Sequence, residues 1–111
     1  MPFLTWAKMM ERHPACHLVM GVHSADKTNR ALLLRSLIET LGITGAFAIR
    51  RGRARGEHIV QAAFAKKEDA ERLAEVVGAR RTGPSGWASR RVFGFGKDVV
   101  TRIEGALATN V

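Results

Sequence analysis

Arginines form two clusters whose side chains could bind a polyanion. In "IRRGRARGEH", residues 49–58, four of them fall within six positions: Arg50, Arg51, Arg53 and Arg55. A second group flanks a loop that contains Gly-Pro-Ser: Arg80, Arg81, Arg90 and Arg91. The planar guanidinium group forms paired hydrogen bonds with phosphate or carboxylate oxygens. The clusters therefore predict contact with nucleic acid or an acidic protein; the alternative is charge that only keeps edge strands from aggregating.

The stretch "HPACH" brings a thiol close to two imidazoles, at His13, Cys16 and His17. Zinc sites need three or four such ligands, usually paired along the chain. Here there is no second cysteine, and His23 lies six strand residues beyond His17, about 20 Å at ~3.3 Å per residue. A cysteine nucleophile also needs a nearby base and a lowered pKa. We predict no metal, no cofactor and no catalytic site, with Cys16 as a small apolar filler; an enzyme that uses Cys16 or a histidine is the least favoured alternative.

Two further segments could hold an anion or a partner. "FGFGKD", residues 93–98, places Gly-x-Gly-Lys between a strand and a helix, but a Walker loop needs glycine where Arg91 stands and serine or threonine where Asp98 stands. The segment is therefore interpreted as a plain turn with Asp98 as the helix cap. Trp87, beside paired arginines, fits an interface anchor or a lid over the core equally well.

The composition is typical of one basic globular domain. The 111 residues suffice for a single core, and 46% are hydrophobic and 25% charged. The net charge is +8, with 9 basic and 3 acidic residues up to residue 56, so the positive field is strongest in the first half. The single cysteine excludes an intrachain disulfide, and no apolar run approaches the ~20 residues that span a membrane. We predict one cytoplasmic domain over residues 1–111, without membrane contact.

The hydrophobic pattern predicts four strands and four helices. The strands cover residues 17–23, 46–51, 57–65 and 89–96; the helices cover residues 2–12, 28–41, 66–77 and a last segment from residue 98. Without the terminal helices, this order is the split βαβ repeat of ferredoxin-like folds. We therefore predict an α+β, ferredoxin-like βαββαβ sandwich. It has a four-stranded antiparallel sheet, two core helices on one face, and additional N- and C-terminal helices.

Strand alternation predicts which side chains face the helices. If Leu18, Met20, Val22, Val60, Ala62 and Phe64 point to the helices, the intervening residues point away: Val19, Gly21, Ile59, Gln61 and Ala63. This second set is small and mostly apolar, so the terminal helices or a second copy of the chain must cover it. The favoured arrangement is a homodimer with an interface of Val19, Ile59, Gln61, Ala63 and Trp87.

The stretch "RGEHIVQAAFAKKEDAERLAEVV", residues 55–77, resembles the third strand and second helix of an RNA recognition motif. In that family, aromatic side chains on the exposed sheet face stack on unpaired bases. The resemblance places those positions at Ile59 and Gln61, and at Val19 on the first strand. None of the three is aromatic, so the stacking platform is absent and the resemblance supports the fold alone.

Three functions are compatible with these observations. The leading prediction is a non-enzymatic binding or assembly domain, homodimeric, whose arginine-rich edges contact nucleic acid or an acidic protein. The alternative is a dimeric small-ligand sensor with a pocket between the sheet face and its cover. The third is the small enzyme named above, for which the sequence shows no assembled group of catalytic residues.

Overall fold

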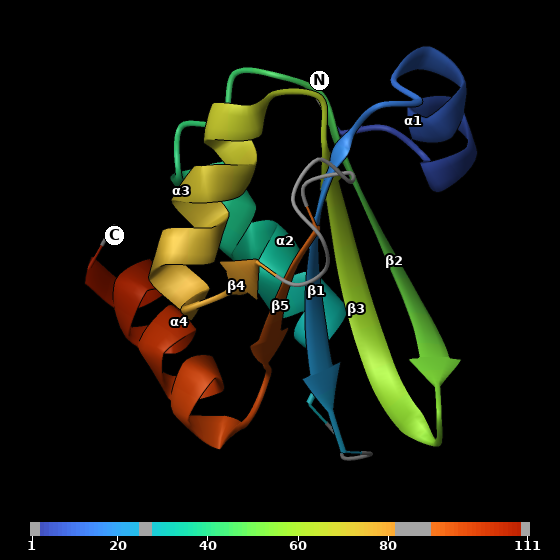
Figure 1. Ribbon diagram of the computed structural model, residues 1–111. Helices are drawn as coiled ribbons and strands as arrows, with labels where there is room; N and C mark the ends of the chain where they lie inside the picture. Colours follow the sequence, from blue (N-terminus) through green and yellow to red (C-terminus); the bar gives the residue numbers. More distant parts are fainter. Residues whose placement is uncertain (1–2, 25–27, 82–89, 110–111) are drawn as a thin grey trace.

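The fold is seen in a computed structural model that describes residues 3–24, 28–81 and 90–109. In chain order the elements are α1 (Trp6–Arg12), β1 (His17–His23), α2 (Arg30–Thr40), β2 (Phe47–Ala54), β3 (Glu57–Phe64), α3 (Lys67–Val77), β4 (Arg80–Arg81), β5 (Arg90–Gly94) and α4 (Lys97–Thr109) (Figure 1). The α+β class is confirmed. None of the described helices is long and apolar enough to cross a membrane. Trp87 lies outside the described residues.

The strands form one mixed sheet in the order β2-β3-β1-β5-β4. Three neighbouring pairs are antiparallel, but β1 and β5 run parallel, with Leu18 beside Arg90 and Val22 beside Gly94. The predicted fully antiparallel, four-stranded sheet therefore differs from the observed one. The cause is the short strand β4, whose two residues were predicted to belong to a loop. It takes the outer edge, and β5 returns antiparallel to it into the place beside β1.

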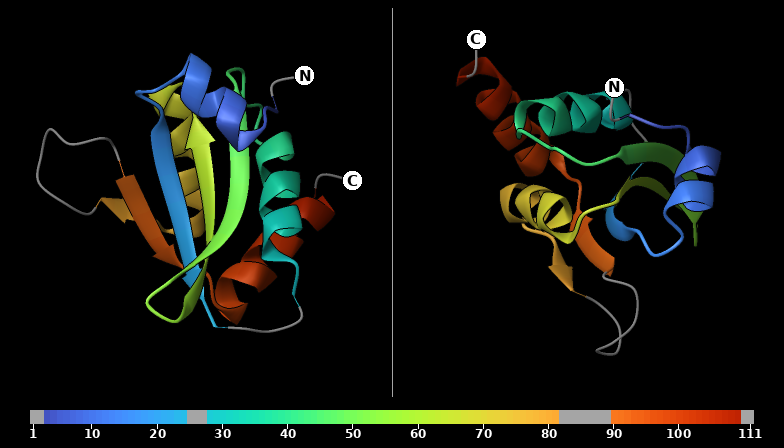
Figure 2. Two further views of the ribbon diagram at one scale, coloured as in Figure 1. Left: turned by 90° about the vertical axis from the view of Figure 1, so that its right-hand side faces the viewer. Right: turned by 90° about the horizontal axis from the view of Figure 1, so that it is seen from above.

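Three helices cover one face of the sheet, and the main core lies beneath them (Figure 2, right). Fully or nearly fully buried side chains come from α2, α3 and α4 and from the central strands: Leu34, Leu37, Ile38, Ala70, Leu73, Val77, Val99, Ile103, Val19, Val60, Ala62, Phe64 and Phe93. The predicted C-terminal helix is thus a third member of this layer. Glycine ends α3, where Gly78 adopts φ 73°, a left-handed conformation that costs glycine little.

Helix α1 packs on the opposite face of the sheet, across one end of it (Figure 2, left). Thr5 begins this helix, since its hydroxyl accepts a hydrogen bond from the Lys8 amide at 3.3 Å. Met9 is fully buried against Cys16, Ala48 and Ala63. A terminal helix therefore provides part of the cover that the apolar second face was expected to need.

The register corrects the predicted orientation of β1. Residues paired across neighbouring strands share a face, and Val19 pairs with Ala62 and Gly21 with Val60. Val19 is therefore buried on the helix side, not on the second face. The prediction was right for β3, where Ala63 faces away. It was wrong for β1 because residues 18–22 of this strand are apolar or glycine on both faces, so alternation alone does not set its orientation.

Candidate functional site

The first arginine cluster divides along strand β2 and its hairpin turn. Arg50 lies on the α1 side, where its Nε donates to Oε1 of Gln61 at 2.6 Å and its guanidinium carbon lies 4.2 Å from the centre of the Trp6 ring. Arg51 and Arg53 lie on the helix side but are exposed, because β2 is an edge strand. Arg55 occupies the exposed turn with φ 53°, before Gly56 at φ 79°. All four arginines are exposed, and Arg50 differs from the others in that its guanidinium group contacts Gln61 and Trp6.

The second cluster lies at the other edge of the sheet. Strands β2 and β4 occupy opposite edges of the sheet, so the two clusters form no common patch. Arg91 is mostly buried and its Nη2 lies 3.6 Å from Oε1 of Glu71, which balances its charge. Arg80 is exposed. The side chains of Arg81 and Arg90 lie outside the described residues. The described part of this cluster therefore offers one solvent-facing arginine.

The exposed hairpin arginines gather instead with basic side chains from other elements, at the end of the sheet where β1 and β5 finish (lower part of Figure 1). Arg30 begins α2 directly after β1, and Lys97 begins α4 directly after β5. The rings of His23 and His58 stack here, with centres 5.5 Å apart. We call this group the basic end: His23, Arg30, Arg51, Arg53, Arg55, His58 and Lys97.

Two adjoining cavities bring five of these residues together, whereas Arg53 and Arg55 line neither cavity. One, of about 200 Å³, is lined by His23, Arg30, Arg51 and His58 among others. The second, of about 410 Å³, shares His23 and Arg30 and extends to Lys97 and Glu57. Arg30 is 4% exposed and anchored, since its Nε donates to the Phe95 carbonyl at 2.8 Å. The fold therefore places a fixed guanidinium between the hairpin and α4.

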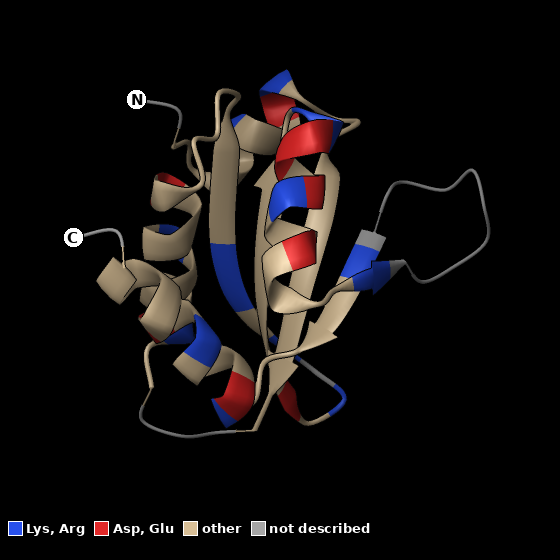
Figure 3. Cartoon of the chain, turned by 90° about the vertical axis from the view of Figure 1, so that its left-hand side faces the viewer, with Lys and Arg blue, Asp and Glu red and all other residues tan. Residues whose placement is uncertain are grey.

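Charge and backbone geometry both favour an anion at the basic end. Among the described residues there, Glu57 and Asp98 are the acids beside five arginines and lysines. The N-termini of α2 and α4 add partial positive charge. By contrast, the exposed face of α3 alternates acidic and basic side chains (Figure 3). The sequence did not reveal this grouping, because Arg30 was interpreted as an ordinary helix residue and Lys97 as part of a plain strand-to-helix turn.

The second sheet face has no base-stacking surface in the part of the chain that the structure describes. The register places these side chains on it: Leu18, Met20, Val22, Ala48, Arg50, Ile59, Gln61, Ala63 and Val92. None of them is aromatic. Val19, which was predicted for this face, lies on the helix side, and its neighbours Leu18 and Met20 lie here instead. Gln61 is 6% exposed and Ala63 lies under α1, so of the predicted interface residues on this face Ile59 is the most accessible.

Cys16 is buried beneath α1, and burial raises the pKa of its thiol above the usual value. A raised pKa means little thiolate at neutral pH, and the thiolate is the reactive form. No group of three or more histidine, cysteine, aspartate or glutamate side chains with metal-site geometry occurs among the described residues. The "HPACH" segment thus places its thiol in the second-face core, in contact with Met9 and Ala48.

We expect the native protein to react slowly with the thiol reagent DTNB at pH 7, and faster as the pH rises toward the raised pKa. Folding favours the protonated thiol, so this group's contribution to stability is present at low pH and is lost as the pH rises through the folded-state pKa. The control is the urea-unfolded chain, which should react at the rate of a free thiol. A native rate equal to the unfolded rate at pH 7 contradicts the buried position and revives the enzyme alternative.

The geometry thus assembles one end of the molecule from a hairpin, two strand ends and two helix starts, where basic side chains outnumber acidic ones. Its cavities are lined by side chains that donate hydrogen bonds to anions. Comparison with protein-family models, curated proteins and solved structures finds no match to this chain.

Proposed function

We propose that the protein is a non-enzymatic binding domain whose basic end contacts the phosphate backbone of nucleic acid. The observation that supports this proposal is the convergence of Arg51 with Arg30, Lys97 and the two stacked histidines around two adjoining cavities, with Arg53 and Arg55 exposed on the same hairpin. Five described cations on one end of a small domain produce a local field that attracts polyanions. Each phosphate that is neutralised releases counterions, which provides most of the affinity of such contacts.

The hairpin suits a phosphate backbone better than a single small anion. Arg51 and Arg53 lie two residues apart on the helix side of β2, and Arg55 follows them in the exposed turn. Neighbouring side chains on one side of a strand are about 6.6 Å apart at ~3.3 Å per residue, close to the spacing of phosphates along an extended strand. Guanidinium groups form forked hydrogen bonds with such oxygens. The hairpin can therefore follow successive phosphates.

The proposed binding does not depend on base sequence. The described strand residues of the second face include no aromatic ring, and the ring of Trp6 on α1 is already in contact with Arg50. The basic end offers arginine, lysine and histidine, which bind phosphates by charge. The dimeric small-ligand sensor remains the alternative. It places a pocket between the second face and its cover, whereas the cavities at the basic end lie on the helix side.

The test is fluorescence anisotropy with a labelled duplex DNA and a labelled single-stranded RNA over a range of salt. We expect the affinity of the native protein to fall with salt, with a log-log slope of about −0.7 to −0.9 per phosphate contact. Replacing Arg51, Arg53 and Arg55 together with alanine should weaken binding about tenfold or more at low salt and reduce the slope by up to about two units. Arg51 and Arg53 are exposed, so the fold should persist.

The matched control removes three positive charges elsewhere, at Lys8, Arg12 and Lys66, all exposed. It should bind nearly as well as the native chain. An equal loss in both triple variants contradicts a site at the basic end, since net charge alone would then explain binding. Binding to poly-glutamate without binding to either nucleic acid assigns an acidic protein partner instead. No retention of any of these polyanions at low salt overturns the proposal.

A further inference from the structure

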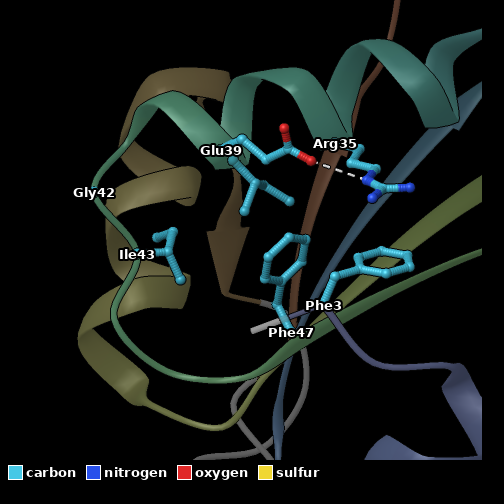
Figure 4. A pocket seen from close by; sticks show the side chains of 7 residues that line it. Phe3, Arg35, Glu39, Gly42, Ile43 and Phe47 are labelled. Carbon is cyan, nitrogen blue, oxygen red and sulfur yellow. Dashed lines mark hydrogen bonds and ion pairs between the residues drawn. The ribbon is translucent and has the colours of Figure 1, made fainter. Parts of the chain in front are cut away.

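A groove beside α2 contains an apolar pocket of about 290 Å³ (Figure 4). Phe3, Ile43 and Phe47 form its apolar walls, and Gly42 stands at its border without a side chain. Arg35 lies over the Phe3 ring, with its guanidinium carbon 4.1 Å from the ring centre, and its Nε donates to Oε1 of Glu39 at 2.9 Å. The pocket thus combines an apolar floor with one cation and one anion on its rim.

A protruding apolar side chain lies on the same strip of the helix. Leu32 is 59% exposed, the one large hydrophobic side chain so exposed in the described ranges. It borders a neighbouring cavity that shares Phe3 and Arg35 with the pocket. Leu32, Arg35 and Glu39 are spaced by three and four residues, which keeps them on one face of α2, and Gly42, two residues beyond the end of the helix, borders the same pocket as Arg35 and Glu39. The strip therefore carries a projection at one end and a recess at the other.

We propose that two copies of the chain associate through this strip, with their α2 helices antiparallel about a two-fold axis at the level of Leu37. In that register Leu32 faces Gly42 of the partner subunit, and Arg35 faces Glu39 of the partner subunit. Both pairs are centred on residue 37, so one axis satisfies them together. Leu32 then enters the partner's pocket, and the four charges form alternating pairs across the axis.

Self-association is favoured over another occupant because this surface is complementary to itself. A two-fold interface uses the same patch on both subunits, so projection and recess must lie on one patch, as they do here. Pairing through the β2 edge instead would bring Arg51 and Arg53 against like charges. On the second sheet face, predicted from the sequence as the dimer interface, α1 already covers Ala63. The α2 strip is therefore the better candidate.

The first test compares solution masses by sedimentation equilibrium over about a hundredfold range of protein concentration, since association follows mass action. The native chain should reach twice the mass of one chain. Leu32→Glu should stay at the mass of one chain, and its exposure makes a folding defect unexpected, which circular dichroism checks. Ile59→Glu, on the second sheet face, should still dimerise. A native chain that stays monomeric, or a dimer that Ile59→Glu disrupts and Leu32→Glu does not, overturns the proposal.

The second test addresses the register by charge complementation. Arg35→Glu and Glu39→Arg each place like charges across the proposed axis, so each variant alone should lose dimerisation. A mixture of the two should recover a heterodimer, because every facing pair then carries opposite charges. Failure of the mixture to recover overturns the antiparallel register. Both tests measure mass without nucleic acid. If no dimer forms, the proposed function is therefore unaffected, and if no nucleic acid binds, the proposed dimer is unaffected.

Discussion

Replacing Phe95 with alanine is expected to lower the free energy of unfolding by about 3–5 kcal/mol, as for other large-to-small changes in protein cores. Phe95 is fully buried just before α4. Its ring centre lies 5.1 Å from that of Phe93 and 6.3 Å from that of His23, and the Arg30 guanidinium carbon lies 5.6 Å away. Removal of the ring opens a cavity between the main core and the basic end.

The measurement for Phe95→Ala is urea unfolding followed by circular dichroism, with the slope compared between variants. Phe3→Ala is the matched control, because it removes the same ring from a half-buried position at the edge of the core. It should cost clearly less. Equal losses for the two variants, or a loss below about 1 kcal/mol for Phe95→Ala, contradict the packing described here.

The helices and the β2–β3 hairpin could be predicted from local signals. Glycines follow α2 and α3 directly or within two residues, and both helices carry apolar residues at helical spacing. Gly52 and Gly56 stand between the two predicted strands, residues 46–51 and 57–65, where a tight reversal was expected. Strand β2 in fact continues through Gly52 to Ala54, and the turn uses Arg55 and Gly56. These features could be predicted because the residues that determine each of them lie within a few positions of one another in the sequence.

The direction of β5 and the orientation of β1 depend on long-range contacts. Strand β4 has two residues, too few to show alternation, and without it β5 was expected to run antiparallel to β1. In β1, one set of alternate residues is Leu18, Met20 and Val22, and the other places Val19 and Gly21 between His17 and His23, so the middle of the strand fits a core on either face. The structure selects Val19 and Gly21 for the helix side because Phe93 and Phe95 fill the space above the glycine.

The strand direction also decides whether the basic end exists. Since β5 runs parallel to β1, the helices that follow both strands begin at the same end of the sheet, beside the hairpin. An antiparallel β5 would place Lys97 at the opposite end, away from Arg30. The sequence therefore identified the exposed hairpin arginines, but not the residues that complete the site. Two parallel strands, each followed by a helix that begins with a basic residue, form the pattern that would have placed Arg30 and Lys97 together.

Gly21→Ala is expected to destabilise the protein by about 1–3 kcal/mol or more, because the added methyl group overpacks the core. A Cβ at this position would lie 2.7 Å from ring atoms of both Phe93 and Phe95, closer than real contacts allow. Both rings are buried, so neither can swing into solvent. Urea unfolding measures the change, and loss of the His23–Phe95 contact should broaden the aromatic signals of the basic end in proton NMR spectra.

The same substitution at another glycine separates overpacking from the general effect of adding a methyl group. Gly105 lies exposed within α4 with no atom near its would-be Cβ, so Gly105→Ala should stabilise the protein by about 0.5–1 kcal/mol. In addition, Phe93→Leu should cost less in the Gly21→Ala background than alone, because a smaller side chain relieves the clash. Two outcomes contradict the contact between Gly21 and Phe93 and would require the opposite orientation of β1. One is that Gly21→Ala and Gly105→Ala shift stability in the same direction. The other is that the costs of Gly21→Ala and Phe93→Leu simply add in the double variant.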